Sequence, residues 1–291
     1  VGLAIGDALG ATVEFMTPRE IAGRYGAHRD IIGGGWLRLE KGSVTDDTEM
    51  SLALGDSIID VGQVDALAVA DAFDQWMRSK PRDIGNTVRR GLMRFRNTGT
   101  TEAPLNDMDA GNGACMRSLP VAISLLGADR QAVNEASRLQ AHITHNAPAA
   151  DAGTECVVHM VQLAISGAAK VDLENRIDDL ISAFPEFRFE NRTISNPGGY
   201  IAETLQAVFS SFVNTSCFES CLIDVVTRGG DADTTGAIAG MIGGAFYGFD
   251  SIPEVWLHTL DGAVLQECLQ QAEALVELSP MYKHQNQRQH R

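Results

Sequence analysis

Two short acidic clusters are the residues of this sequence best suited to chemistry. The first is Thr45-Asp46-Asp47-Thr48 and the second is Gly230-Asp231-Ala232-Asp233-Thr234, and each stands where a helical pattern begins. Together they supply four carboxylates and several hydroxyls, with no His or Cys in either segment. Oxygen-only ligation suits a hard divalent cation such as Mg²⁺, Mn²⁺ or Ca²⁺ better than zinc or copper. The clusters therefore predict a site for one or two such cations.

A purely structural role at two helix starts is the alternative interpretation. Asp and Thr side chains cap the free N–H groups of a first helical turn and complement the helix dipole without binding a ligand. A cap needs only one carboxylate, however. Asp46-Asp47 and Asp231-x-Asp233 hold like charges together, and these repel unless a cation lies between them. The pairing of acidic residues in both clusters favours the metal site.

The composition indicates an ordinary globular chain with a strongly acidic balance. With 291 residues, 44% of them hydrophobic, the chain can bury a large core. Its formal net charge of −15 opposes nucleic-acid binding, which depends on neutralising phosphates with Lys and Arg. No apolar run is long enough for direct membrane insertion. Five cysteines, an odd number with no CxxC pair, indicate free thiols in a reducing compartment, and we expect a cytoplasmic protein.

Helical periodicity dominates the sequence and predicts an all-α fold. Strand-like alternation is confined to residues 34–39 and 187–189. We expect a single domain over residues 1–281 and a polar, frayed tail over residues 282–291. Because the chain opens at Val1 inside a helical pattern, we expect the natural protein to begin earlier. The segments with helical spacing of apolar residues are 50–61, 67–76, 114–126, 149–165, 201–212, 237–246 and 264–278.

Two runs of glycine at four-residue spacing predict close helix packing. Gly2-x3-Gly6-x3-Gly10 and Gly236-x3-Gly240-x3-Gly244 each place small residues on one helical face, which lets two backbones approach closely. Asp7 and Glu14 argue against a membrane helix at the first run. Both runs lie near an acidic cluster, so we expect this packing to hold the two clusters close together at the core.

Several motifs resemble, in the same order, those of the ADP-ribosylglycohydrolases, and they span almost the whole chain. In one departure, the family's Thr-His-Asn-His-Pro stretch has Ala147 in place of the second His. The resemblance implies a compact multi-helix orthogonal bundle with a dinuclear Mn²⁺ or Mg²⁺ site at the base of an ADP-ribose cleft. The motifs are Gly6-Asp7-Ala8-Leu9-Gly10, Glu14, Thr45-Asp46-Asp47-Thr48, Gly111-Asn112-Gly113-Ala114, Thr144-His145-Asn146 and Gly229-Gly230-Asp231-x-Asp233-Thr234.

The resemblance also implies the metal ligands and places Asp83 on a loop that touches the distal ribose. Asp83 and Glu14, four residues beyond Gly10, are the candidate catalytic carboxylates, with Asp83 preferred for proton transfer and Glu14 expected to act as a base or as a metal-adjacent residue. A surface carboxylate and a helix cap are the structural alternatives for these two residues. The metal ligands that it implies lie in the two acidic clusters and are Thr45, Asp46, Asp47, Asp231, Asp233 and Thr234.

A second set of residues is expected to bind the ADP-ribose group. Gly111-Asn112-Gly113 precedes an expected helix whose first N–H groups suit a diphosphate, although the same letters are typical of a plain turn. The resemblance places Asn86 near the distal ribose and His145 near the phosphates or metals. Tyr200 is expected to stack on adenine. A structural His and a buried core Tyr are the alternatives.

The reaction that the resemblance implies is metal-dependent hydrolysis of the N-glycosidic bond between ADP-ribose and an arginine of a target protein. Residues 33–39 and Gly85-Asn86-Thr87 most resemble bacterial family members that reactivate the nitrogenase iron protein. For such members a PII-type signalling protein and an ammonium transporter are implied as partners, with peripheral recruitment to the inner membrane through them.

Two other functions compete with this one. The first is a hydrolase of another ADP-ribose linkage, serine-linked or in a small molecule, since metal ligands do not define the linkage. The second is a non-catalytic ADP-ribose-binding protein, which would be expected to have lost part of the acidic clusters. Both clusters are complete here, which favours an enzyme.

Overall fold

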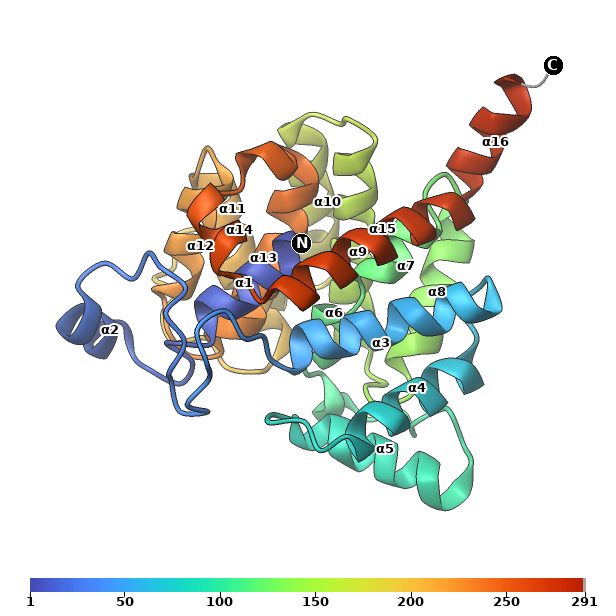
Figure 1. Ribbon diagram of the computed structural model, residues 1–291, viewed down its shortest axis with the longest axis horizontal. Helices are drawn as coiled ribbons and strands as arrows, with labels where there is room; N and C mark the ends of the chain where they lie inside the picture. The colour runs from blue at the N-terminus through green and yellow to red at the C-terminus, as the bar shows by residue number, and fades with distance from the viewer. Residues whose placement is uncertain (290–291) are drawn as a thin grey trace.

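Helices α1 (Gly2–Gly10) and α13 (Ala232–Tyr247) pack against each other at the centre of the molecule, as the computed structural model shows (Figure 1). The two helices are antiparallel. A Cβ atom added at Gly6 would overlap the carbonyl oxygen of Gly236, and one added at Gly2 would overlap that of Gly240. Only glycine allows this approach of the two backbones. The prediction of close packing through the glycine runs is confirmed.

The structure describes residues 1–289, which contain no β-strand, so the all-α prediction is confirmed. Helices α9, α11 and α12 pack around the central pair. The elements other than α1 and α13 are α2 (Pro18–Tyr25), α3 (Asp46–Val61), α4 (Ala66–Arg78), α5 (Asn86–Thr98), η1 (Asp107–Asp109), α6 (Gly113–Met116), α7 (Leu119–Ser124), α8 (Arg130–Ala141), α9 (Pro148–Ile165), α10 (Lys170–Ala183), η2 (Pro185–Phe187), α11 (Ile201–Asn214), α12 (Phe218–Val226), η3 (Phe249–Ser251), α14 (Glu254–Thr259), α15 (Gly262–Leu278) and α16 (Pro280–Gln289).

Helix α3 begins with the first acidic cluster and is fixed along its length by its neighbours. It packs against α4 and α15 (Figure 1). Met50 and Leu54 are completely buried on its inner face. Gln271 of α15 donates hydrogen bonds of 2.8 Å to the carbonyl oxygen of Leu52 and to Asp56. These contacts give the cluster a rigid support.

The prediction of a single helix over residues 114–126 is wrong, because the structure has the two short helices α6 and α7 there. Pro120, which lacks an N–H group, lies in the first turn of α7. Arg117 stands at the break and is completely buried. Its guanidinium lies 4.4 Å from the ring centroid of Phe73 and donates to Thr144. The chain therefore turns where this side chain enters the core.

The two strand-like segments do not form strands in the described residues. Residues 34–39 make a hairpin closed by one antiparallel bridge between Gly34 and Leu39, and η2 ends at Phe187. Helix α16 projects from the body of the molecule (Figure 1), and it makes the described part of the segment predicted to be a frayed tail helical. Residues 290–291 of that segment lie outside the described residues, and a domain boundary at residue 281 stays a prediction.

Candidate active site

A cleft of about 640 Å³ opens beside the start of α13, and chain segments that are far apart in the sequence line it. These segments include the turn after α1, the loop before α5 and the loop before α11. No Lys or Arg lines the cleft within the described part of the chain. The carboxylates that line it are Glu14, Asp46, Asp83, Asp231 and Asp233.

Asp7 of α1 positions the first acidic cluster. Its completely buried carboxylate accepts hydrogen bonds from the backbone N–H groups of Thr45 (3.0 Å) and Thr48 (3.1 Å) and from both hydroxyls (2.9 and 2.5 Å). Burial raises the pKa of Asp7 to about 6, although these hydrogen bonds act in the opposite direction. The carboxylate of α1 thus satisfies N–H groups at the start of α3. Asp7 is not among the site residues that the sequence predicts, although its place between Gly6 and Gly10 is a signal that could have indicated it.

The structure does not support capping as the purpose of the acidic clusters. Thr45 and Asp231 are the N-cap residues of α3 and α13, and neither side chain caps its helix. Asp47 instead joins the two clusters, because its Oδ2 accepts a hydrogen bond of 3.2 Å from the hydroxyl of Thr234. Its Oδ1 is buried without a hydrogen-bond partner. A buried carboxylate oxygen left without a partner is energetically costly, so another ligand is expected there.

Burial and mutual repulsion act on the clustered carboxylates. Burial, followed by the charges of neighbouring acids, raises the pKa values of Asp46 and Asp47 well above 3.8. Asp233 is affected in the same way, with Glu14 as the neighbour that contributes most. Burial likewise raises the pKa of Glu14 to about 8. A bound cation would offset this accumulation of negative charge.

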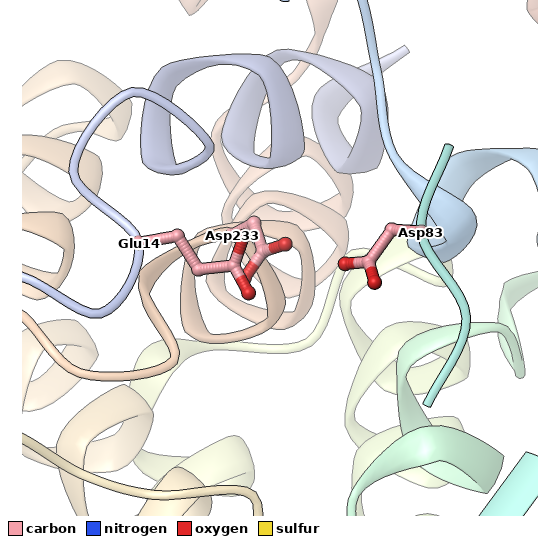
Figure 2. A group of neighbouring side chains, drawn as sticks. All are labelled: Glu14, Asp83 and Asp233. Atoms are coloured by element: carbon pink, nitrogen blue, oxygen red, sulfur yellow. The ribbon is translucent and has the colours of Figure 1, made fainter. Parts of the chain in front are cut away.

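Three carboxylates from separate segments converge in the cleft (Figure 2). Glu14 follows α1, Asp83 precedes α5 and Asp233 lies in the first turn of α13. One oxygen atom of each lies within 4.8 Å of the other two. The two predicted catalytic carboxylates and one predicted metal ligand therefore meet at one place. This oxygen-only donor set fits a hard divalent cation.

The loop before α5 carries Asp83 and is attached to the first cluster. Asp83 is half-buried, and its Oδ1 accepts a hydrogen bond from the N–H of Ile84. The N–H of Gly85 donates to Asp46 at 3.4 Å. Asn86, the first residue of α5, is exposed and lines the cleft. Burial raises the pKa of Asp83, with a smaller contribution from the charge of Asp231.

The segment Gly111-Asn112-Gly113 also lines the cleft, but Asn112 is already engaged within the protein. Its backbone N–H donates to the carbonyl oxygen of Gly199 at 2.9 Å. Its side chain donates to Asp231 at 2.6 Å and to Thr204 at 3.0 Å. The helix that follows, α6, has only four residues. Asn112 therefore positions Asp231 and the loop before α11, and its N–H group is not free for a phosphate.

His145 is a neutral, buried residue beneath the glycine segment. A Cβ atom at Gly113 would lie 2.7 Å from its ring, so the glycine allows the ring to line the cleft. Its Nδ1 lies 2.7 Å from the hydroxyl oxygen of Thr144, which accepts a hydrogen bond from Arg117. Burial, with the positive charges of Arg117 and Arg90, lowers the pKa of His145 to about 3. This arrangement favours a proton on Nε2.

Three of the predicted site residues are not part of the cleft lining, namely Thr45, Asp47 and Tyr200. Thr45 and Asp47 are buried behind Asp46 at the start of α3. Tyr200 is 42% exposed, so the alternative that it is a buried core residue is wrong. A single bridge pairs its backbone with Gly111.

The chain belongs to the ADP-ribosylglycohydrolase family, whose family model matches residues 1–285. The chain is similar to the ADP-ribosyl-[dinitrogen reductase] glycohydrolase of Rhodospirillum rubrum, with 48% identity over 281 residues, or 96% of this chain and 94% of that protein. It is also 32% identical over 299 residues to the ADP-ribosylarginine hydrolase Tri1 of Serratia proteamaculans (strain 568), covering 96% and 78% of the two chains. A solved structure described as an ADP-ribosylglycohydrolase-related protein complex matches with a TM-score of 0.84, 33% identity and 95% coverage of both chains.

The same fold is therefore present in the chain and in that solved structure, and the predicted fold family is confirmed. Within the described residues, no helix combines the length and the apolar character that a membrane span requires.

Proposed function

We propose that this protein is a hydrolase that releases ADP-ribose from an arginine of dinitrogenase reductase, the nitrogenase iron protein, and so restores its activity. The observation that carries the proposal is the 48% identity, over 96% of the chain, with the R. rubrum protein named for that substrate. The similarity to an ADP-ribosylarginine hydrolase supports the same linkage. The acidic cleft adds a chemical argument, because it suits both divalent cations and a positively charged guanidinium.

Two divalent cations, Mn²⁺ or Mg²⁺, are part of this proposal. The protein groups that would hold them are those of the two acidic clusters, Thr45, Asp46, Asp47, Asp231, Asp233 and Thr234. When bound, such ions would orient the ribose hydroxyls and make a bound water more acidic. Asp7 would keep the first cluster in place, and Asn112 would orient Asp231.

Asp83 and Glu14 are proposed to carry out the proton transfers of the reaction. Cleavage of the glycosidic bond leaves its electron pair on a guanidine nitrogen, which must gain a proton, while the water that adds to the anomeric carbon must lose one. A positioned carboxylate typically accelerates such transfers by ~10²–10⁴-fold. Asp83 is half-buried and converges with Glu14 and Asp233, so it could carry a proton between the groups that lose and gain one.

The ADP-ribose group would be held largely by uncharged groups. Because no Lys or Arg lines the cleft within residues 1–289, its diphosphate would depend on backbone N–H groups near Gly111 and Gly113 and on Nε2 of neutral His145. Asn86 would contact the distal ribose. The exposed ring of Tyr200 would stack on the adenine.

The cellular setting follows from the same proposal. A hydrolase of dinitrogenase reductase would work in the cytoplasm. A PII-type signalling protein and an ammonium transporter would recruit it to the inner membrane peripherally. These partners stay predictions from the family resemblance, and co-precipitation of the full chain with each of them is the direct test.

The enzymatic proposal is tested by incubating arginine-ADP-ribosylated dinitrogenase reductase with the full chain and Mn²⁺ or Mg²⁺. Released ADP-ribose and regained reductase activity are measured together. We expect both to appear at the same rate. A serine-ADP-ribosylated peptide serves as the comparison substrate. Release from the peptide but not from the reductase would assign the enzyme to another linkage.

A further inference from the structure

Two exposed aromatic side chains stand at the mouth of the acidic cleft. Phe15 is 63% exposed and Trp36 is 52% exposed, and both line the cleft together with Glu14. Their ring centroids are 5.4 Å apart, with a tilt of 48° between the rings. Exposed contact between two large aromatic residues is informative because burial would be more favourable for both. The pair is therefore a candidate for contact with a substrate.

The backbone holds Phe15 in an unusual conformation. Its φ angle of 61° lies in the left-handed region, which bulky residues rarely adopt. The N–H of Phe15 donates to the carbonyl oxygen of Gly230 at 2.7 Å. Gly230 directly precedes Asp231, so Phe15 is attached to the turn that begins the second acidic cluster. Such strain is often found at ligand-binding sites, where surrounding contacts maintain it.

Trp36 is presented by the hairpin that covers the end of α1. The bridge between Gly34 and Leu39 closes the hairpin. Gly35 has a φ angle of 68°, and a Cβ atom there would lie 2.5 Å from the carbonyl oxygen of Ala11. The hairpin therefore lies directly on the turn that leads to Glu14 and Phe15, which fixes Trp36 relative to both.

The hydrogen bond between Trp36 and Glu14 connects the aromatic pair to the carboxylates. Nε1 of Trp36 donates to Oε2 of Glu14 at 2.6 Å. Because Nε1–H is the only polar group of the indole, the rest of the side chain is available for contact through its ring. Glu14 is one of the three carboxylates that converge in the cleft. An aromatic surface thus adjoins a negatively charged one.

These two surfaces match the chemistry of a guanidinium group. A guanidinium is planar and positively charged, stacks on aromatic rings and pairs with carboxylates. No Lys or Arg lines the cleft among residues 1–289 to compete with it. The uncharged glycosidic oxygen of a serine-linked substrate would gain little from either surface.

We propose that Phe15 and Trp36 form the subsite for the guanidinium side of the scissile bond and thereby favour arginine-linked substrates. This inference rests on the proposed arginine linkage and adds the residues that recognise it. The two rings act in binding the substrate side chain, and proton transfer stays with the carboxylates.

Steady-state kinetics on ADP-ribosylarginine provide the first test. Phe15→Ala and Trp36→Ala should each lower kcat/KM about tenfold, the effect expected for losing a cation–π contact. Inhibition by ADP-ribose, which lacks the guanidinium, should change less than about twofold. Trp36→Phe keeps a ring but loses the hydrogen bond to Glu14, so it should retain most of the activity.

Phe249→Ala is the matched control, because Phe249 is an exposed aromatic residue, 47% exposed, that does not line the cleft. Its kinetics should equal those of the wild type. Equal losses of ADP-ribosylarginine turnover and of ADP-ribose binding in Phe15→Ala would overturn the proposal. A Trp36→Phe variant as impaired as Trp36→Ala would also overturn it, since the hydrogen bond rather than the ring would then matter.

A binding experiment separates this inference from the proposed function. Agmatine, a small alkylguanidinium, is titrated into the full chain while tryptophan emission is recorded. The other two tryptophans, Trp76 and Trp256, are buried, so Trp36 is the exposed reporter. We expect saturable quenching in the wild type that is absent in Trp36→Phe and weakened in Phe15→Ala. This quenching without ADP-ribosylarginine turnover would uphold the subsite and contradict the proposed function. Turnover of ADP-ribosylarginine without quenching by agmatine would overturn the proposed subsite.

Discussion

The carboxylate of Asp7 receives four donors from the first acidic cluster, two N–H groups and two hydroxyls. Hydrogen bonds to charged acceptors contribute more to stability than neutral ones, and breaking one in a buried place leaves the acceptor partly unsatisfied. The order of this cluster therefore depends on a residue that is not one of the proposed metal ligands.

Thr48→Val should reduce stability because it removes the 2.5 Å hydroxyl donor to Asp7 at nearly constant volume. We expect the free energy of unfolding to fall by about 2 kcal/mol. Urea denaturation measures the change. Thr227→Val is the control, because its hydroxyl bonds only to carbonyl groups of its own helix, and it should cost about 0.5 kcal/mol or less. Equal losses in the two variants would contradict the role of Asp7.

Asp47→Asn should affect stability and metal affinity in opposite directions. It removes one charge from a cluster of repelling carboxylates, so the metal-free protein should become more stable. Mn²⁺ affinity should fall by more than about tenfold, because a charged ligand is lost. Denaturation in chelator and calorimetric titration with Mn²⁺ measure the two effects. A destabilised metal-free variant with unchanged affinity would show that Asp47 is a structural residue.

The packing of α1 on α13 connects the two halves of the site. Helix α1 holds the start of α3 through Asp7, and α13 begins with the second cluster. The glycine contacts between α1 and α13 therefore set the separation of the two clusters. A substitution at this contact should change the separation of the two clusters even though it adds no group to the cleft.

Gly6→Ala tests this dependence, because its Cβ would overlap the carbonyl oxygen of Gly236. Overpacking of this kind typically costs about 1–3 kcal/mol, and a rigid backbone neighbour favours the upper end. Chemical denaturation gives the value, and Mn²⁺ affinity should fall with it. Gly23→Ala in α2 is the control, since nothing lies within 4 Å of its added Cβ. It should stabilise the protein by about 0.5–1 kcal/mol. A Gly6→Ala variant of wild-type stability would contradict the packing.

The sequence was most informative where local pattern and structure agree. Strong apolar periodicity predicted α9 and α11, and the repeated carboxylates indicated the two clusters. The break at Arg117 was not predictable, because the partners that bury this side chain lie on other helices. The contacts of Asp7 and Phe15 were missed for the same reason, since both depend on residues far along the chain.

The metal-free protein should lose global stability as pH rises. Burial places the pKa of Asp7 at about 6 and that of Glu14 at about 8, above their ordinary values of 3.8 and 4.5. Between the ordinary and the raised pKa of each residue, the folded chain binds more protons than the unfolded chain. The free energy of unfolding therefore decreases with increasing pH.

Urea denaturation in chelator across pH 4 to 8 measures this slope, within the interval that those pKa values define. Glu14→Gln should make stability depend less on pH at the upper end of this range, and added Mn²⁺ should restore stability at the alkaline end. Stability that rises over the same interval, or a slope that Glu14→Gln leaves unchanged, would contradict the unfavourable burial of these carboxylates.

We infer that the two acidic clusters belong to one metal-dependent hydrolase site. The rate of ADP-ribose release from arginine-ADP-ribosylated dinitrogenase reductase is therefore measured as Mn²⁺ is added back after chelation. We expect no release in chelator, recovery with Mn²⁺ in the wild type, and a loss of at least about a hundredfold in Asp233→Asn at every Mn²⁺ concentration. Release that persists in chelator would show that the enzyme does not need a metal, and an Asp233→Asn variant that recovers like the wild type would show that the second cluster is not part of the site.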